Sequence, residues 1–131
     1  MTRPQLVQPF KLFSALTVVL VLLQAFMAGR GWFIDPDLLK DHGYVGDVTF
    51  VSVALQCILV SQIGLVNPLR NRLIGLNGLL LILVTVQLAL GYSGRDSSTA
   101  AAWHVPNGVL IFGLACFNMA LAAQLPRRGA A

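Results

Sequence analysis

The stretch FKLFSALTVVLVLLQAFMA, residues 10–28, carries a single charged side chain, Lys11, close to its start. A helix needs about 20 mostly apolar residues to cross the hydrocarbon core of a bilayer. The stretch therefore predicts a membrane-spanning helix. Its apolar run is longer than that of a typical secretory signal peptide, so we interpret it as a helix that the protein retains.

The rest of the chain has the same character. Of the 131 residues, 56% are hydrophobic and 11% are charged, whereas about a quarter of the residues in a typical soluble domain are charged. Three further segments are apolar over the length of a span, at residues 48–66, 73–92 and 101–125. The sequence predicts an all-α protein, an antiparallel four-helix bundle integral to a membrane, with residues 1–131 as its single domain.

The basic residues are unevenly divided among the loops. Arg30, Lys40 and Arg95 lie in the first and third loops, and the other six of the nine lie in the middle loop and near the two ends of the chain. Cytoplasmic loops are enriched in basic residues, so we expect a bacterial inner-membrane protein with both termini in the cytoplasm. The net charge of +4 then reflects topology, and we expect no nucleic-acid partner. The cytoplasmic group is Arg3, Lys11, Arg70, Arg72, Arg127 and Arg128.

Local signals mark the ends of the helices. Asp35 and Pro36 are typical of an N-cap followed by a first helical residue, so we expect the second helix to begin near Pro36. Asn67 and Pro68 are expected to stop that helix, and Pro106 to bend the fourth helix if the helix has already begun. The expected N-cap of the fourth helix is Ser97, Ser98 or Thr99. The expected aromatic belt at the outer interface is Trp32, Tyr44, Tyr92 and Trp103.

The two halves of the chain are related by an internal repeat. Polar and glycine positions recur 63 residues apart before the outer loop and 62 residues apart after it. We interpret residues 8–66 and 71–125 as one two-helix unit used twice. Both copies then have the same orientation, around an axis along the membrane normal. The pairs are Gln24 with Gln87, Gly31 with Gly94, His42 with His104, Gly46 with Gly108, and Gln56 with Asn118.

This symmetry puts the two histidines of the chain at one depth on the outer side, facing each other. A facing pair of imidazoles favours axial ligation of one haem iron, with His42 and His104 as the metal ligands. Gly46 and Gly108, one turn inward on the same helix faces, are expected to leave room for the porphyrin edge. The chain has no CxxCH attachment motif, so the haem is expected to be of type b. The basic residues expected near its propionates are Arg30, Lys40 and Arg95.

Other interpretations of these residues stay open. A histidine near a membrane interface also bonds backbone carbonyls or water. Gln24 and Gln87 can bond a histidine or a quinone head group, or they can bond one helix to another, as we expect of Asn77 and Asn118. Two histidines are too few for a typical zinc site.

Several function classes have no support in the sequence. Cys57 and Cys116 form no CxxC pair, and we expect them to behave as small hydrophobic residues. The chain has no glutamate, no set of a nucleophile and a base, and no phosphate-binding loop. Hydrolysis and phosphoryl transfer are therefore not expected, and neither is a stand-alone enzyme.

The segments LLQAFMAGRG, DHGYVG, LVTVQLALGYSG and WHVPNGVLIFGLA resemble a family of small four-helix bacterial membrane proteins, domain of unknown function 6220. In that family each half has a glutamine, a glycine-bearing outer turn, and a histidine followed by glycine four residues later. The resemblance covers nearly the whole chain and implies the four-helix fold, but no activity. The architecture also resembles small four-helix b-type cytochromes, which usually carry more histidines, for two haems.

Two hypotheses about function follow. In the first, the protein binds haem b and transfers electrons on the outer side of the membrane. In the second, it is a cofactor-free accessory subunit of a larger respiratory or photosynthetic membrane complex. A quinone, or no cofactor at all, is the alternative to haem. In either case the bilayer is an expected partner.

Overall fold

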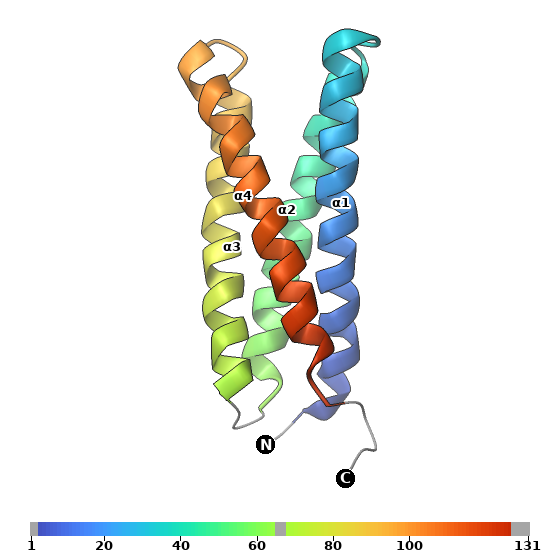
Figure 1. The fold of residues 1–131 in the computed structure, drawn as a ribbon, viewed down its shortest axis with the longest axis vertical. Helices are drawn as coiled ribbons and strands as arrows, with labels where there is room; N and C mark the ends of the chain where they lie inside the picture. The colour runs from blue at the N-terminus through green and yellow to red at the C-terminus, as the bar shows by residue number, and fades with distance from the viewer. Residues whose placement is uncertain (1–2, 65–67, 127–131) are drawn as a thin grey trace.

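The computed structural model describes residues 3–64 and 68–126 and contains four long α-helices in that part of the chain (Figure 1). A short 3-10 turn, Pro4–Leu6, precedes α1, Val7–Phe33. Then follow α2, Leu38–Gln62, α3, Pro68–Ser93, and α4, Ser98–Ala123. Each helix is long and apolar enough to cross a membrane. The predicted all-α four-helix bundle is confirmed.

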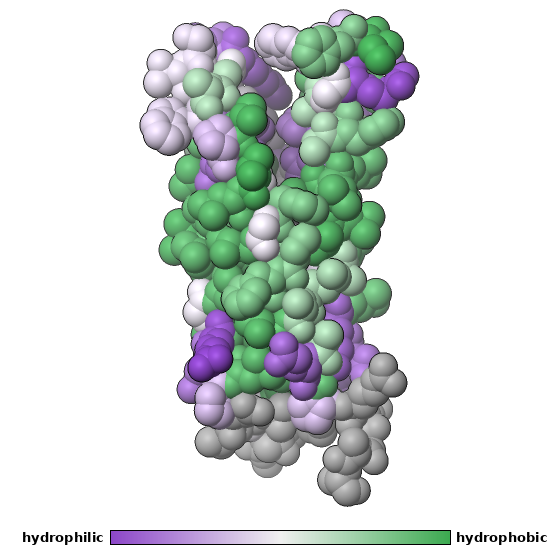
Figure 2. Space-filling model, in the orientation of Figure 1, coloured by the Kyte–Doolittle hydropathy of each residue, from purple (hydrophilic) through white to green (hydrophobic). Residues whose placement is uncertain are grey.

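The helices form two antiparallel hairpins, α1 with α2 and α3 with α4. Each helix packs against its two neighbours in the cyclic order α1, α2, α3, α4, so α2 lies diagonally opposite α4. Figure 1 shows both hairpin turns at one end of the bundle and the two chain termini at the other. We call these the hairpin end and the terminal end. Figure 2 shows a hydrophobic band around the middle of the bundle, with hydrophilic residues towards both ends.

The second helix does not end where the sequence predicted. It ends at Gln62, before the expected stop at Asn67 and Pro68, because Gly64 adopts a φ of 68°. That left-handed conformation is easy for glycine and typical of the residue after a helix C-terminus. Pro68 is instead the first residue of α3, where a missing N–H costs nothing. The predicted turn residues Val66 and Asn67 lie outside the described residues, as do Arg127 and Arg128.

The starts of α2 and α4 can be compared with those that the sequence predicts. α2 begins at Leu38, two residues after the expected start at Pro36, and the Asp35 carboxylate accepts the N–H of Asp37 at 3.3 Å in the turn before it. The fourth helix has one of its expected caps, since the hydroxyl of Ser97 accepts the N–H of Ala100 at 3.3 Å. Pro106 lies inside α4, and the bend expected there stays a prediction.

A layer of buried polar side chains crosses the interior of the bundle, between two apolar clusters. The Gln56 amide nitrogen donates to the hydroxyl of Thr17 at 2.6 Å, and Asn118 donates to the Gln56 oxygen at 3.0 Å. Asn77 donates to Asn118 at 2.8 Å, the expected bond between helices. Because lipid is as apolar as leucine, such bonds and close packing hold membrane helices together. The layer takes residues from all four helices: Ser14, Thr17, Ser52, Gln56, Asn77 and Asn118.

Positions related by the offsets of 63 and 62, which we call equivalent, have similar surroundings at both hairpin turns. A Cβ on Gly31 would lie 2.9 Å from the Leu39 side chain, and a Cβ on Gly94 would lie 3.3 Å from the Cα of Ala101. Leu39 and Ala101 are themselves equivalent. Each glycine therefore lets the next helix approach closely as the chain turns. The repeat boundaries, 8–66 and 71–125, stay a prediction.

Candidate functional site

The two histidines face each other across the bundle. His42 lies on α2 and His104 on the diagonally opposite α4. Each histidine lies in the second turn of its helix and is half-buried. Their ring centroids are 6.0 Å apart, with 69° between the ring planes. Residues 62 positions apart in the sequence thus form a pair at the hairpin end.

Each imidazole is anchored by the backbone of the preceding helix. The Nδ1 atom of His42 lies 3.0 Å from the carbonyl oxygen of Gln24, and Nδ1 of His104 lies 3.1 Å from the carbonyl oxygen of Gln87. A carbonyl only accepts hydrogen bonds, so Nδ1 carries a proton in both rings, and in a neutral ring this leaves the lone pair on Nε2. Sequence analysis identified both glutamines but not the role of their backbone carbonyls. Every residue has a carbonyl, so the residue type does not show which one binds a histidine.

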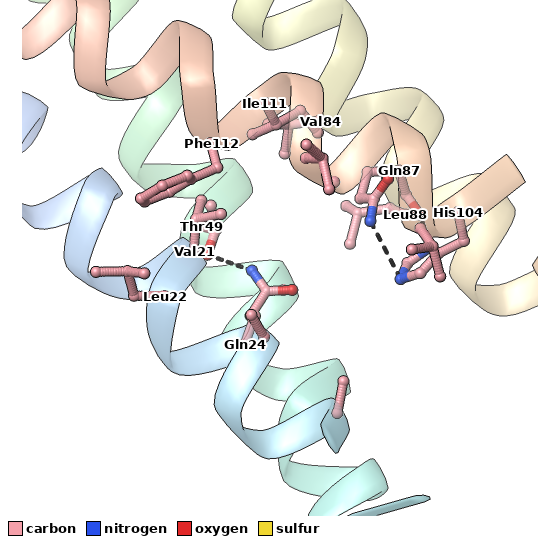
Figure 3. Close-up of a pocket in the computed structure, with 16 residues that line it drawn as sticks. Val21, Leu22, Gln24, Thr49, Val84, Gln87, Leu88, His104, Ile111 and Phe112 are labelled. Carbon is pink, nitrogen blue, oxygen red and sulfur yellow. Dashed lines mark hydrogen bonds between the residues drawn. The ribbon is translucent and has the colours of Figure 1, made fainter. Parts of the chain in front are cut away.

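The side chains of the two glutamines differ in what they bind. Gln87 donates from its amide nitrogen to Nε2 of His104 at 3.1 Å, while its oxygen accepts from Asn107 at 2.7 Å. Gln24 donates instead to the hydroxyl of Thr49 on α2 at 2.8 Å (Figure 3). Of the two open expectations, Gln87 bonds a histidine and Gln24 bonds one helix to another. Within the described chain, Nε2 of His42 has no hydrogen bond.

Glycines provide the space for these side chains. A Cβ on Gly46 would lie 3.5 Å from the Gln24 oxygen, and one on Gly108 would lie 3.1 Å from the Gln87 nitrogen. Both predicted glycines therefore border a glutamine amide. A Cβ on Gly91 would lie 3.0 Å from the His104 ring. Sequence reasoning missed Gly91 and Asn107, and only their closeness to His104 and Gln87 in space reveals them.

The three basic residues predicted near the site lie further out. Arg30, Lys40 and Arg95 are all exposed, Arg30 and Lys40 near the ends of their helices and Arg95 in the turn between α3 and α4. The guanidinium of Arg30 lies 5.8 Å from the ring centroid of Phe26, and that of Arg95 lies 5.1 Å from the centroid of Tyr92. They share the hairpin end with the histidines, and no hydrogen bond between described residues joins them to either ring.

A cavity of about 360 Å³ lies beside His104, with most of its lining residues on α1 and α4 and the rest on α2 and α3 (Figure 3). Its wall is mostly apolar, and Gln24, Thr49, Gln87 and His104 provide its polar atoms. The volume lies in the range of small-molecule sites, about 300–1,000 Å³. The remaining lining residues are Val21, Leu22, Ala25, Ala28, Gly46, Val84, Leu88, Val105, Gly108, Val109, Ile111 and Phe112.

Other chemistry-bearing residues do not join the site. In residues 3–64 and 68–126, no three side chains of the histidine, cysteine, aspartate or glutamate type gather in one place. Cys57 and Cys116 are free thiols, and Cys57 donates to the backbone carbonyl of Asn77.

Comparisons with protein-family models, with curated proteins and with solved structures find no match to this chain. The resemblance to domain of unknown function 6220, and that to four-helix b-type cytochromes, stay predictions. The site consists of two facing imidazoles, each with Nδ1 on a backbone carbonyl, two glutamine amides and an adjoining apolar cavity.

Proposed function

We propose that the chain is a multi-pass membrane protein that holds one haem b between His42 and His104 and transfers electrons at the hairpin end. The observation that carries the proposal is the facing of these two rings, 6.0 Å between centroids, with Nδ1 of each on a glutamine carbonyl. A metal-bound histidine typically donates its other ring N–H to such a partner, which fixes the tautomer and makes the ligand more basic.

The donor set fits a haem iron. Two neutral imidazoles are common axial ligands, and the bound haem supplies a one-electron redox centre. Nε2 of His42 has no hydrogen bond from the described residues, whereas Nε2 of His104 has to exchange the Gln87 amide for the metal. Gly91 provides space against the His104 ring. Gln24 and Gln87 act as positioning residues through their carbonyls.

The exposed basic residues at the same end suit the haem propionates. Arg30, Lys40 and Arg95 have cationic ends in reach of solvent, and a propionate carboxylate pairs most strongly with a guanidinium.

A visible spectrum of the purified protein tests this proposal. Protein from haem-replete cells is expected to show a sharp Soret band and, after dithionite reduction, a resolved α band, the signature of low-spin haem with two imidazole ligands. The double variant His42→Ala/His104→Ala is expected to lose both bands. Thr85→Ala, at an exposed hydroxyl of α3, is the matched control and should keep them. Colourless wild-type protein would rule the haem proposal out.

The second candidate, a cofactor-free accessory subunit of a larger membrane complex, is favoured by one observation. Gln87 already provides hydrogen-bond partners to both ring nitrogens of His104. A histidine so satisfied needs no metal, and the pair can serve to join the hairpins. Colourless protein that co-purifies with a larger membrane complex would support this function in place of the first.

The proposed location is a bacterial inner membrane with both termini in the cytoplasm, and the uneven division of basic residues supports it. Single cysteines at Gln5 and Pro126, in a chain with Cys57→Ala and Cys116→Ala, are expected to resist a membrane-impermeant maleimide in intact cells. A cysteine at Ser98 is expected to react. Labelling of either terminal cysteine would reverse the orientation and move the histidines to the cytoplasmic side.

A further inference from the structure

The cavity between α1 and α4 opens sideways, through the apolar surface of the bundle. Val105 and Val109 line it and are 66% and 68% exposed, and Leu22, also exposed, lines it from α1. These three residues lie within helices that have the length and composition of membrane spans. In a membrane, a molecule that enters the cavity here comes from the bilayer. A lipid-soluble ligand therefore suits this cavity.

The wall of the cavity indicates a neutral head group. No described charged side chain lines it, and an unpaired charge inside a membrane protein is costly. Its polar atoms belong to two amides, a hydroxyl and an imidazole. A phospholipid or fatty-acid head group would bring a charge without a partner, whereas an uncharged ring with oxygen substituents would not.

Gln24 provides both a donor and an acceptor to such a ligand. Its amide nitrogen uses one of two hydrogens on Thr49. Its side-chain oxygen has no hydrogen bond from any described residue and lies 3.5 Å from the place of a Cβ on Gly46. A quinone carbonyl accepts hydrogen bonds and a quinol hydroxyl donates them, so one amide can bind both redox states.

We propose that this cavity binds the head group of a membrane quinone, with Gln24 as its principal polar contact. Ala25, Ala28 and Gly108 have small or absent side chains along the wall, which admits a flat ring. This site goes beyond the haem proposal and can be tested apart from it, since His42 does not line the cavity, although His104 and Gly108, which the haem proposal also uses, do.

The two interfaces between the hairpins, α1 with α4 and α2 with α3, which we call seams, differ beside this cavity. At the equivalent seam, between α2 and α3, Leu88 takes the place of Ala25, and its Cδ2 lies 3.3 Å from the place of a Cβ on Gly46. The Tyr92 hydroxyl also donates to the Asp47 carboxylate across that seam, at 3.1 Å. At the α1–α4 seam no described atom of α1 lies within 4 Å of a Cβ built on Gly108.

Binding of a decyl-substituted benzoquinone to the protein in nanodiscs of quinone-free lipid tests the proposal. After removal of free ligand, the retained quinone is measured by extraction and absorbance. We expect saturation at one quinone per chain. Ala25→Phe fills the cavity and should weaken binding about tenfold or more. Ala89→Phe, on the exposed face of α3 where the equivalent residue is Phe26, should leave the affinity unchanged.

Two further measurements separate the possible outcomes. Gln24→Met keeps the shape of the side chain and removes both polar atoms, so it should weaken the quinone about fivefold, the worth of about 1 kcal/mol of hydrogen bonding. Decylbenzene, which lacks the oxygens, should not compete. Equal affinity of wild type and Ala25→Phe, or full competition by decylbenzene, would overturn the quinone site.

The haem and quinone proposals fail separately. His42→Ala should lose the haem spectrum and keep quinone binding, because its side chain lies outside the cavity wall. Ala25→Phe should keep the haem spectrum and lose quinone binding. If both variants lost both ligands while keeping their helical circular dichroism, the two sites would be one, and the separate quinone site would be refuted.

Discussion

The two seams between the hairpins are built from equivalent residues, yet one is closed and the other contains a cavity. Between α2 and α3, Leu88 packs over Gly46; between α1 and α4, Ala25 leaves the space beside Gly108 open. A repeat can therefore specify where helices run, while a single side chain decides whether the space between two helices stays open.

The two histidines also occupy equivalent positions but have different surroundings. Both rings bond an equivalent carbonyl, but the neighbours of the glutamines are not the same. Thr49 draws the Gln24 amide to α2, whereas isoleucine, Ile111, stands at the equivalent position in α4. Asn107 holds the Gln87 oxygen and leaves its nitrogen for His104, and Val45 is the equivalent residue in α2.

The largest effect is expected from removing one histidine. His42→Ala and His104→Ala should each abolish the low-spin haem spectrum, and to the same extent, because the haem proposal gives the two facing rings the same role. Haem content per chain, measured as the pyridine haemochrome, checks this. If one variant kept a full complement of low-spin haem while the other lost it, the symmetric ligation would be wrong.

The polar layer is where equivalent side chains bond directly, since Asn118 donates to Gln56. Gln56→Leu and Asn118→Leu each leave buried partners unsatisfied, so each should lower the free energy of unfolding by about 1–3 kcal/mol. In the double variant the loss should be smaller than the sum of the two. Unfolding in mixed micelles with increasing SDS measures all three. Simple additivity would mean that the two amides are not coupled.

Substitutions at Thr49 and Ile111 are expected to exchange the hydrogen-bonding patterns of the Gln24 and Gln87 amides. Thr49→Ile removes the hydroxyl that holds the Gln24 nitrogen, so this amide should turn to His42 and compete with the metal. One such hydrogen bond is worth about 1 kcal/mol, so haem affinity should fall about fivefold. The reciprocal variant, Ile111→Thr, should raise it. Competition with apomyoglobin measures both, and an unchanged affinity in Thr49→Ile would show that the glutamine contacts do not regulate ligation.

The smallest effect is expected at the helix starts. Ser97 caps α4 through its hydroxyl, whereas Asp37 precedes α2 without a side-chain cap. Ser97→Ala should therefore cost about 1 kcal/mol of stability, and Asp37→Ala should cost almost nothing. The same SDS titration compares them. A larger loss in Asp37→Ala would mean that the turn before α2 contributes more than its hydrogen bonds indicate.

Much of the fold follows from the sequence alone. The four apolar stretches predicted the four helices because crossing a bilayer is a matter of length and hydropathy along the chain. The recurrence of Gln24 and His42 as Gln87 and His104 led to the expectation that the histidines face each other, as they do in the structure. The end of α2 could also have been predicted, since Gly64 is a typical residue after a helix C-terminus. The prediction relied instead on Pro68 and therefore placed the end of the helix too late in the chain.

Only the tertiary structure decided how the site is completed. The carbonyls that anchor the imidazoles, the direction of each glutamine amide and the closure of one seam depend on pairs such as Leu88 with Gly46 and Gln24 with Thr49. These residues are far apart in the sequence and belong to different helices. Their contacts follow from the rotation and spacing of packed helices, which apolar composition leaves free because every face of a membrane helix is apolar.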